Sequence, residues 1–144
     1  MLSAPMADCA FCAIVTGTAP AAVVLDEPDV LAFLDVRPLF AGHVLTVPKE
    51  HHVALADLPG PLLPVLFDAV QRLSAALPRA VGAQGTFVAV NNLVSQSVPH
   101  LHVHVVPRTR GDGLRGFFWP RTRYGCDEEM EAAAASIRKA LSAG

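Results

Sequence analysis

The stretch QSVPHLHVHVVPR, residues 96–108, places His100, His102 and His104 at every second position. Side chains at alternate positions of a β-strand point to the same face, so the three imidazoles are predicted to share one face of a strand. The apolar residues between them then supply the opposite face, which packs into a core. Strand faces are usually filled by Val, Ile or aromatic residues, and a row of histidines therefore indicates a chemical role.

Several interpretations of this histidine row are open. A neutral imidazole serves as a nucleophile, a general acid–base group or a metal ligand, and histidines also occur on solvated strands without any role. A metal site built directly on the row suits zinc, copper or iron. Nearby Asn91, Gln96 and Ser97 offer neutral hydrogen-bonding groups, which suit phosphate oxygens better than a metal ion. Phosphate chemistry is therefore the favoured interpretation.

The composition is that of one soluble domain spanning residues 1–144. The 144 residues are 52% hydrophobic, enough for a single core. A formal net charge of −2 offers no chain-wide electrostatic case for binding nucleic acid or a membrane. The first residues lack a signal-peptide pattern and no apolar run reaches the roughly 18 residues of a spanning helix, so a cytoplasmic location is expected. No organic cofactor is expected.

The hydrophobic pattern predicts an α+β fold. Five short runs rich in β-branched and aromatic residues have the pattern of strands: 22–27, 30–35, 43–49, 85–91 and 100–106. The first three predict an antiparallel meander, and the last two predict neighbouring strands. Helical periodicity over 61–77, with Pro78 as a stop signal, predicts one long central helix, and 127–141 predicts a C-terminal helix.

Two spaced motifs resemble the histidine triad (HIT) family. QSVPHLHVHVV is similar to its His-x-His-x-His-x-x signature, where x is hydrophobic. LAFLDVRPLFAGHVLTVPKEH, residues 31–51, resembles its second hallmark, an aspartate after an aromatic strand followed by G-H-x-L-x-x-P-K-x-H. The resemblance implies a HIT-like antiparallel sheet, with a domain core over about 9–108 and a C-terminal extension over 109–144.

The resemblance also implies roles for the polar residues around the histidine row. His102 attacks the α-phosphorus of a nucleotide, and the main-chain carbonyl of His100 accepts its other N–H. His104 donates to phosphate oxygens. Ser97 is a candidate contact to the bridging or leaving atom, and Gln96 is a candidate contact to the phosphate.

The upstream hallmark implies the nucleoside site. Asp35 accepts hydrogen bonds from both ribose hydroxyls, and Phe33 with Leu34 and Val36 forms the base pocket. From local sequence alone, Asp35 is also interpretable as a turn residue that satisfies backbone donors. His43 lines the active site beside the triad in one interpretation and is structural in the other.

The loop before the histidine row departs from the family pattern. Asn91 resembles the asparagine that precedes the triad, and Asn92 competes for that role. Relatives commonly have a longer, glycine-containing loop that ends in Gly-Gln, whereas this chain has Leu93-Val94-Ser95 before Gln96.

These implications predict a nucleotide-binding hydrolase that forms a covalent nucleotidyl-histidine. Its expected substrates are nucleoside phosphoramidates or dinucleoside polyphosphates, with a purine base. A nucleotidyltransferase or phosphorylase and a non-catalytic nucleotide-binding regulatory module are the alternatives. The family resemblance and the apolar face of the central helix favour a homodimer. Segment 112–125, which holds Phe117, Phe118 and Trp119, is either a determinant of substrate choice or an apolar clasp or dimer surface.

Cys9 and Cys12 form a C-x-x-C, which in a cytosolic chain indicates metal binding or redox chemistry, although the pair is also interpretable as merely buried. The family resemblance implies a structural zinc bound by these cysteines, by His51, which closes P-K-x-H, and by His100. The adjacent His52 competes with His51 for the third position.

Overall fold

The computed structural model describes residues 7–115 and 121–143, which fall into two units divided between Asp112 and Gly113. The elements of the first unit are α1 Ala10–Val15, β1 Val23–Asp26, β2 Val30–Leu34, β3 Val44–Pro48, the 3-10 turn η1 Leu55–Asp57, α2 Leu62–Val81, β4 Gly85–Ala89 and β5 Val103–Arg108. The second unit contains α3, Asp127–Ala143. The predicted α+β class is therefore confirmed, and Phe117, Phe118 and Trp119 lie outside the described residues.

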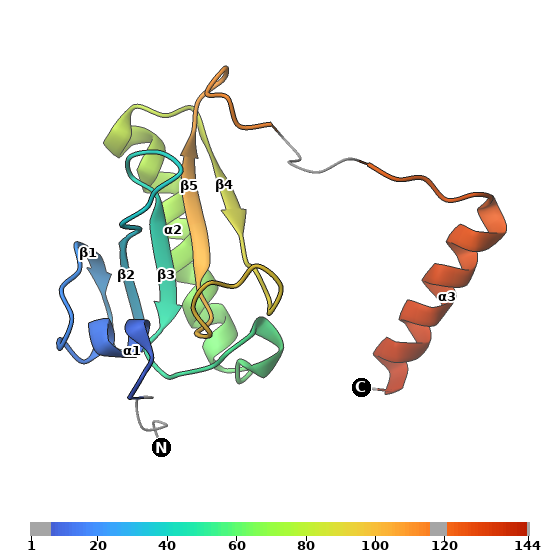
Figure 1. Ribbon diagram of the computed structural model, residues 1–144, viewed down its shortest axis with the longest axis horizontal. Helices are drawn as coiled ribbons and strands as arrows, with labels where there is room; N and C mark the ends of the chain where they lie inside the picture. The colour runs from blue at the N-terminus through green and yellow to red at the C-terminus, as the bar shows by residue number, and fades with distance from the viewer. Residues whose placement is uncertain (1–6, 116–120, 144) are drawn as a thin grey trace. The chain divides into compact units, whose positions relative to one another are not determined.

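The described strands form one antiparallel sheet in the order β1-β2-β3-β5-β4 (Figure 1). The predicted meander is present as β1 to β3, and the predicted neighbours β4 and β5 are paired. Strand β5 lies beside β3, where Leu45 is paired with His104. This pairing brings the two sequence hallmarks together in the centre of the sheet.

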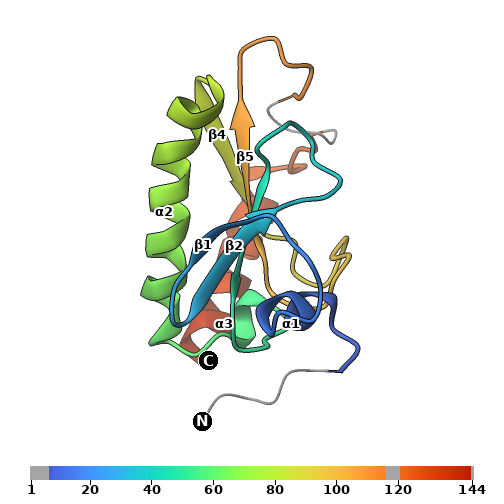
Figure 2. The ribbon, with the colours of Figure 1, turned by 90° about the vertical axis from the view of Figure 1, so that its left-hand side faces the viewer.

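The two faces of the sheet have different coverings (Figure 2). Helix α2 covers one face, where Leu66 and Val70 pack with alternate strand residues such as Val30 and Val103. On the other face, α1 contributes Phe11 to a second apolar cluster. The alternation predicted for the histidine row holds, because the intervening apolar residues pack into the α2 core.

The central helix does not stop at Pro78 as predicted, but continues to Val81. Proline lacks the N–H that would bond to the carbonyl four residues earlier, and so close to a helix end this removes only one hydrogen bond. The helix ends at Gly82, whose φ of 71° lies in the left-handed region that glycine tolerates.

The last strand starts at Val103, not at His100 as predicted. Over the preceding residues, backbone hydrogen bonds run to loops, because the His100 N–H donates to the Val98 carbonyl and the Leu101 N–H to the His52 carbonyl. His100 therefore lies in a bend before β5, His102 directly precedes the strand, and His104 lies within it. Strand β4 also differs from its prediction, because it ends at Ala89 and not at Asn91.

Helix α3 begins at Asp127, close to its predicted start, with three acidic residues in its first turn. Its apolar residues Met130, Ile137 and Leu141 are exposed. No helix among the described residues is both long enough and apolar enough to cross a membrane.

Candidate active site

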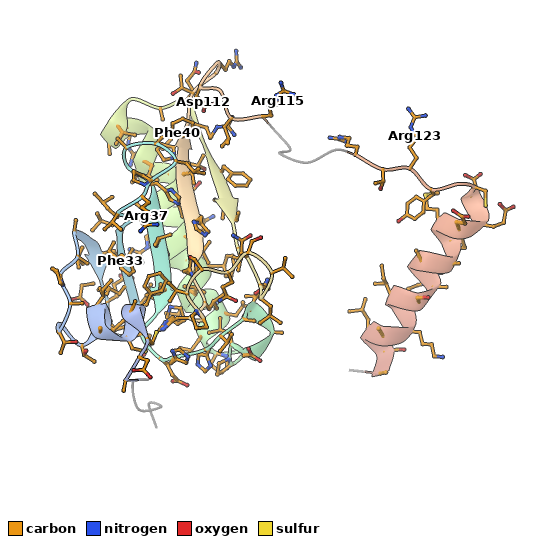
Figure 3. All side chains as sticks on the ribbon, in the orientation of Figure 1. Phe33, Arg37, Phe40, Asp112, Arg115 and Arg123 are labelled. Atoms are coloured by element: carbon orange, nitrogen blue, oxygen red, sulfur yellow. The ribbon has the colours of Figure 1, made fainter. Side chains whose placement is uncertain are left out.

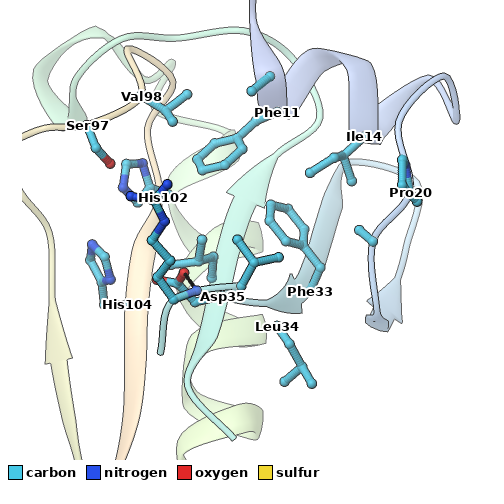
Figure 4. Close-up of a pocket in the computed structure, with 15 residues that line it drawn as sticks. Phe11, Ile14, Pro20, Phe33, Leu34, Asp35, Ser97, Val98, His102 and His104 are labelled. Carbon is cyan, nitrogen blue, oxygen red and sulfur yellow. Dashed lines mark hydrogen bonds between the residues drawn. The ribbon is translucent and has the colours of Figure 1, made fainter. Parts of the chain in front are cut away.

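A pocket of about 530 Å³ lies between α1, the end of β2 and residues 97–104, which are termed the histidine segment. Figure 4 shows Ser97, His102 and His104 on one side of it, Phe33 on the other and Asp35 between them. Polar groups and an apolar wall thus face one shared space, which suits a ligand with a polar end and a flat apolar end.

The ring of His102 is held by the hydrogen bond expected from the sequence. Its Nδ1 lies 2.7 Å from the main-chain oxygen of His100, and the side chain is buried. A carbonyl oxygen only accepts, so Nδ1 carries the proton. The Nε2 atom of the neutral ring therefore keeps its lone pair, which is the arrangement a nucleophile requires.

His104 has the opposite tautomer, and a hydrogen-bond chain sets it. The Leu39 N–H donates to Nδ1 of His43 at 3.0 Å, so the proton of neutral His43 lies on Nε2. This Nε2 lies 2.9 Å from Nδ1 of His104 and donates to it. The proton of neutral His104 therefore lies on Nε2.

His104 is kept neutral by its surroundings. Burial, with smaller contributions from the neighbouring His102 and His43, lowers the pKa of His104 to about 4, although Asp35 opposes the shift. Its Nε2 is buried and has no hydrogen-bond partner among the described residues. A buried donor without a partner is costly, so this N–H is suited to a ligand oxygen.

His43 lies behind His104 and does not line the pocket. It is buried, and burial lowers its pKa although Asp35 opposes the shift. Its Nδ1 accepts from the Leu39 backbone, which leaves that nitrogen without a proton. His43 therefore reaches the pocket only through its hydrogen bond to His104.

Asp35 both closes a turn and lines the pocket. Its Oδ1 accepts the Arg37 N–H at 2.8 Å, which closes the turn after β2. The carboxylate also lines the pocket, where Oδ2 lies 3.8 Å from Nε2 of His43. The hydrogen bond from the Arg37 N–H holds the carboxylate in the pocket wall.

The loop before the triad contains Asn91, Gln96 and Ser97, and of these three predicted residues Ser97 alone lines the pocket. Gln96 bridges backbone groups, since its Nε2 donates to the Val53 carbonyl at 2.6 Å and its Oε1 accepts the Leu93 N–H. Asn92 accepts the Leu55 N–H, and Asn91 is exposed. Gln96 and Asn92 therefore hold the loop in place.

A second group of side chains lies next to the pocket and is termed the metal cluster. It consists of Cys9, Cys12, His51 and His100, whose nearest ligand atoms all lie within 4.8 Å of one another. His52 lies outside it, with Nε2 3.0 Å from Glu50. The predicted choice of His51 over His52 agrees with this geometry.

The metal cluster fits a tetrahedral zinc ion. Zinc bonds of ordinary length place S and N ligands about 3.5 Å apart and two N ligands about 3.3 Å apart. Here Cys9 and Cys12 lie 3.4 and 3.6 Å from Nδ1 of His100, Cys12 lies 3.3 Å from Nδ1 of His51, and the two Nδ1 atoms are 3.2 Å apart. Nε2 of His100 donates to the Pro48 carbonyl at 2.8 Å, which leaves Nδ1 free as a ligand.

The pocket lining includes residues that were not predicted from the sequence, and two of them, Phe11 and Arg37, have large or charged side chains. Phe11 lies between the cysteines on α1, and its ring lies 5.0 Å from that of His102. Arg37, in the segment between β2 and β3 (Figure 3), is the one Arg or Lys among the described residues that line the pocket, and forms no ion pair with a described carboxylate. Only the C-x-x-C around Phe11 and the Asp35 hallmark beside Arg37 pointed to these positions.

The sequence also matches a family model. The model described as HIT domain matches residues 16–111. An uncharacterised HIT-like protein of Mycobacterium tuberculosis is 37% identical over 139 residues, 93% of each chain. The adenosine 5'-monophosphoramidase hnt1 of Schizosaccharomyces pombe is 32% identical, covering 90% of this chain and 95% of its own. The adenylylsulfatase HINT3 of Arabidopsis thaliana is 33% identical, covering 74% of this chain and 55% of its own.

Solved structures agree with these relatives. The crystal structure of SMU.412c from Streptococcus mutans has a TM-score of 0.85 at 34% identity, covering 94% of this chain and 87% of that one. A Zn-bound histidine triad family protein from Mycobacterium smegmatis has a TM-score of 0.71 at 35% identity, covering 95% of this chain and 98% of that one.

Proposed function

This chain belongs to the HIT domain family, and on that premise we propose that it is a nucleotide hydrolase. Its proposed reaction is cleavage at the α-phosphate of nucleoside phosphoramidates or dinucleoside polyphosphates through a covalent nucleotidyl-histidine. The relatives named as a phosphoramidase and an adenylylsulfatase support hydrolysis of a nucleoside phosphate derivative. The proposed catalytic unit is residues 9–108, with 109–144 as an extension.

The observation that carries the proposal is the opposite tautomers of His102 and His104. One ring offers a lone pair and the other offers a donor, and their centroids lie 5.0 Å apart in the same pocket. A nucleophile beside a donor is what transfer at phosphorus requires, because negative charge increases on the phosphoryl oxygens as the bond forms.

The proposed reaction has two steps. Nε2 of His102 bonds to the α-phosphorus as the bond to the leaving group breaks; the leaving group takes the electron pair, and an amine leaving group also takes a proton from solvent. Water then attacks phosphorus, the bond between phosphorus and Nε2 breaks with its electron pair returning to the nitrogen, and the attacking water gives its proton to solvent. His104 donates through Nε2–H to a phosphoryl oxygen, Ser97 contacts the leaving atom, and the proposed role of His100 is its carbonyl bond to His102.

The proposed nucleoside site is formed by other residues that line the pocket. The Asp35 carboxylate accepts from the ribose hydroxyls, and Phe33 contacts a purine base. Arg37 supplies a permanent positive charge in the same pocket as His104, which burial keeps neutral. Gln96 is proposed to act through the shape of the loop, since it bonds to Val53, and the exposed Asn91 is proposed to contact the nucleotide.

A structural zinc is the second part of the proposal. Its proposed ligands are the four members of the metal cluster, whose spacing fits a tetrahedral ion. A bound zinc supplies a cross-link between α1, the segment after β3 and the histidine segment. The Zn-bound relative from Mycobacterium smegmatis supports zinc binding in this family. A redox role for the cysteines is the weaker alternative, because each sulfur lies within 3.4 Å of a histidine nitrogen.

A turnover panel tests the proposed reaction. Adenosine and guanosine phosphoramidates and dinucleoside polyphosphates are offered with and without phosphate as an acceptor. Release of nucleoside monophosphate without an acceptor is the expected result. Turnover only with an acceptor would instead identify a transferase or phosphorylase, and tight nucleotide binding without any turnover would identify a regulatory module.

A further inference from the structure

We propose that Phe11 is a positioning residue through which the metal cluster and the nucleotide pocket are coupled, so that zinc and nucleotide each tighten the binding of the other. This inference rests on the proposed function, because the nucleotide is the second ligand. Phe11 contacts His100 of the metal cluster and His102 of the nucleotide pocket, but it is neither a metal ligand nor a polar group of the pocket.

The position of Phe11 in the chain and its contacts in the fold carry the inference. It lies between Cys9 and Cys12, so any change in the cysteine turn moves it. Its ring meets that of His102 edge-on, at 5.0 Å and 87°, and that of Phe33 at 5.3 Å and 68°. One side chain thus contacts the proposed nucleophile and the wall of the proposed base pocket.

Helix α1 depends on tertiary contacts for its order. It has six residues, and isolated helices of that length are unstable in water. Its first residue is capped by Cys9, whose Sγ accepts the Cys12 N–H at 3.4 Å. Metal ligation ties both cysteines to His51 and His100, and without it the helix is held mainly by apolar packing.

The pocket depends on the same helix. Ala10, Phe11 and Ile14 all line it, so a nucleotide can bind fully only when α1 is in place. A ligand that orders α1 lowers the entropic cost for the other ligand, and the coupling is reciprocal because both belong to one thermodynamic cycle. Zinc binding is therefore expected to be tighter when nucleotide is bound.

The experiment measures the zinc dissociation constant by competition with a chromophoric chelator, with and without saturating AMP. AMP binding to the zinc-loaded full chain is first measured by calorimetry, and a zinc–AMP blank corrects for direct chelation. Three proteins are compared: wild type, Phe11→Leu, and Val15→Ala as the control. Val15 is on the same helix and packs in the same apolar cluster, but it does not line the pocket.

In wild type and Val15→Ala, AMP is expected to lower the zinc dissociation constant at least about fivefold. In Phe11→Leu, which keeps every metal ligand, the change is expected to fall below about twofold. Equal zinc affinity with and without AMP in wild type overturns the coupling. Equal coupling in all three proteins shows that it passes through folding as a whole and overturns the role of Phe11. Absence of AMP binding to the zinc-loaded wild type overturns the proposed function itself.

Discussion

Two histidines two residues apart differ in chemistry because their hydrogen-bond partners differ. His102 bonds to the carbonyl of its own segment, whereas His104 accepts from His43, which in turn accepts from Leu39. The imidazole rings are identical, so the groups that hydrogen-bond to their Nδ1 atoms leave a lone pair on Nε2 of His102 and a proton on Nε2 of His104. The role of each residue is therefore set outside the histidine row.

The half-buried, neutral state of His104 predicts acid sensitivity. Its pKa is about 4 in the folded protein against 6.5 for the free side chain, so between these values the unfolded chain binds a proton that the folded protein does not. The free energy of unfolding is expected to fall as the pH drops from 6.5 towards 4 and to gain nothing from this group above 6.5. Urea unfolding at several pH values measures this.

His104→Gln is the matched control, because glutamine keeps a donor without a group that titrates in this range. The variant is expected to lose less stability than wild type over the same interval. Parallel pH curves for the two proteins would contradict a neutral His104.

At the scale of elements, the site lies where irregular segments meet regular ones. The turn after β2 provides Asp35, and the segment before β5 provides His102. The loop before that segment contains Leu93 and Ser95, with φ of 67° and 61°. Neither residue is glycine, so the backbone is left-handed here without the residue that favours this conformation.

Gly42 is required by the turn that leads into β3. Its φ is 96°, and an added Cβ would lie 3.0 Å from Cγ1 of Val81. Gly42→Ala is expected to lower the free energy of unfolding by about 1–3 kcal/mol, because it adds backbone strain and a contact with α2. Gly60→Ala, where an added Cβ meets nothing within 4 Å, is the control and should change stability by less than about 1 kcal/mol in chemical unfolding. Equal effects of the two changes would contradict this explanation.

The metal cluster predicts metal content. Purified protein is expected to contain about one zinc per chain by elemental analysis, since four ligands complete one tetrahedral site. Joint replacement of Cys9→Ser and Cys12→Ser is expected to release the zinc and lower Tm, because metal binding is linked to folding. Cys126→Ser, at an exposed position, is the control and should keep the metal. Metal-free native protein with Tm unchanged by chelation would refute the zinc assignment.

At the scale of the whole molecule, the sequence predicted features that depend on local patterns. The alternation of histidine and apolar residues was sufficient to predict that the histidines lie on the side opposite the α2 core. The predicted start of β5 at His100 was wrong because the Leu101 N–H bonds to the carbonyl of His52, a contact that no local pattern encodes. Helix α1 was missed because it is too short to show periodicity, and Gln96 was expected at a phosphate but bonds to Val53.

Assembly into a homodimer remains a prediction. Leu63 and Phe67 are exposed on α2, and Val88 is exposed on β4, which is an edge strand. Apolar residues near an edge strand favour pairing with a second copy. Sedimentation at micromolar concentration should give about twice the 15.2 kDa chain mass, and Phe67→Glu should shift the protein towards monomer. Val24→Glu on β1 is the control, and a wild-type monomer over this range would rule out the dimer.

The central claim is that His102 is the nucleophile, and trapping the covalent intermediate tests it most directly. Rapid acid-free quenching during turnover of an adenosine phosphoramidate, followed by peptide mass spectrometry, is expected to show an adenylyl group on His102. His102→Ala is expected to show no adduct and to lose at least about a thousandfold in turnover, while AMP binding is largely kept. An adenylyl group on another residue, or near-normal turnover by folded His102→Ala, would contradict the account.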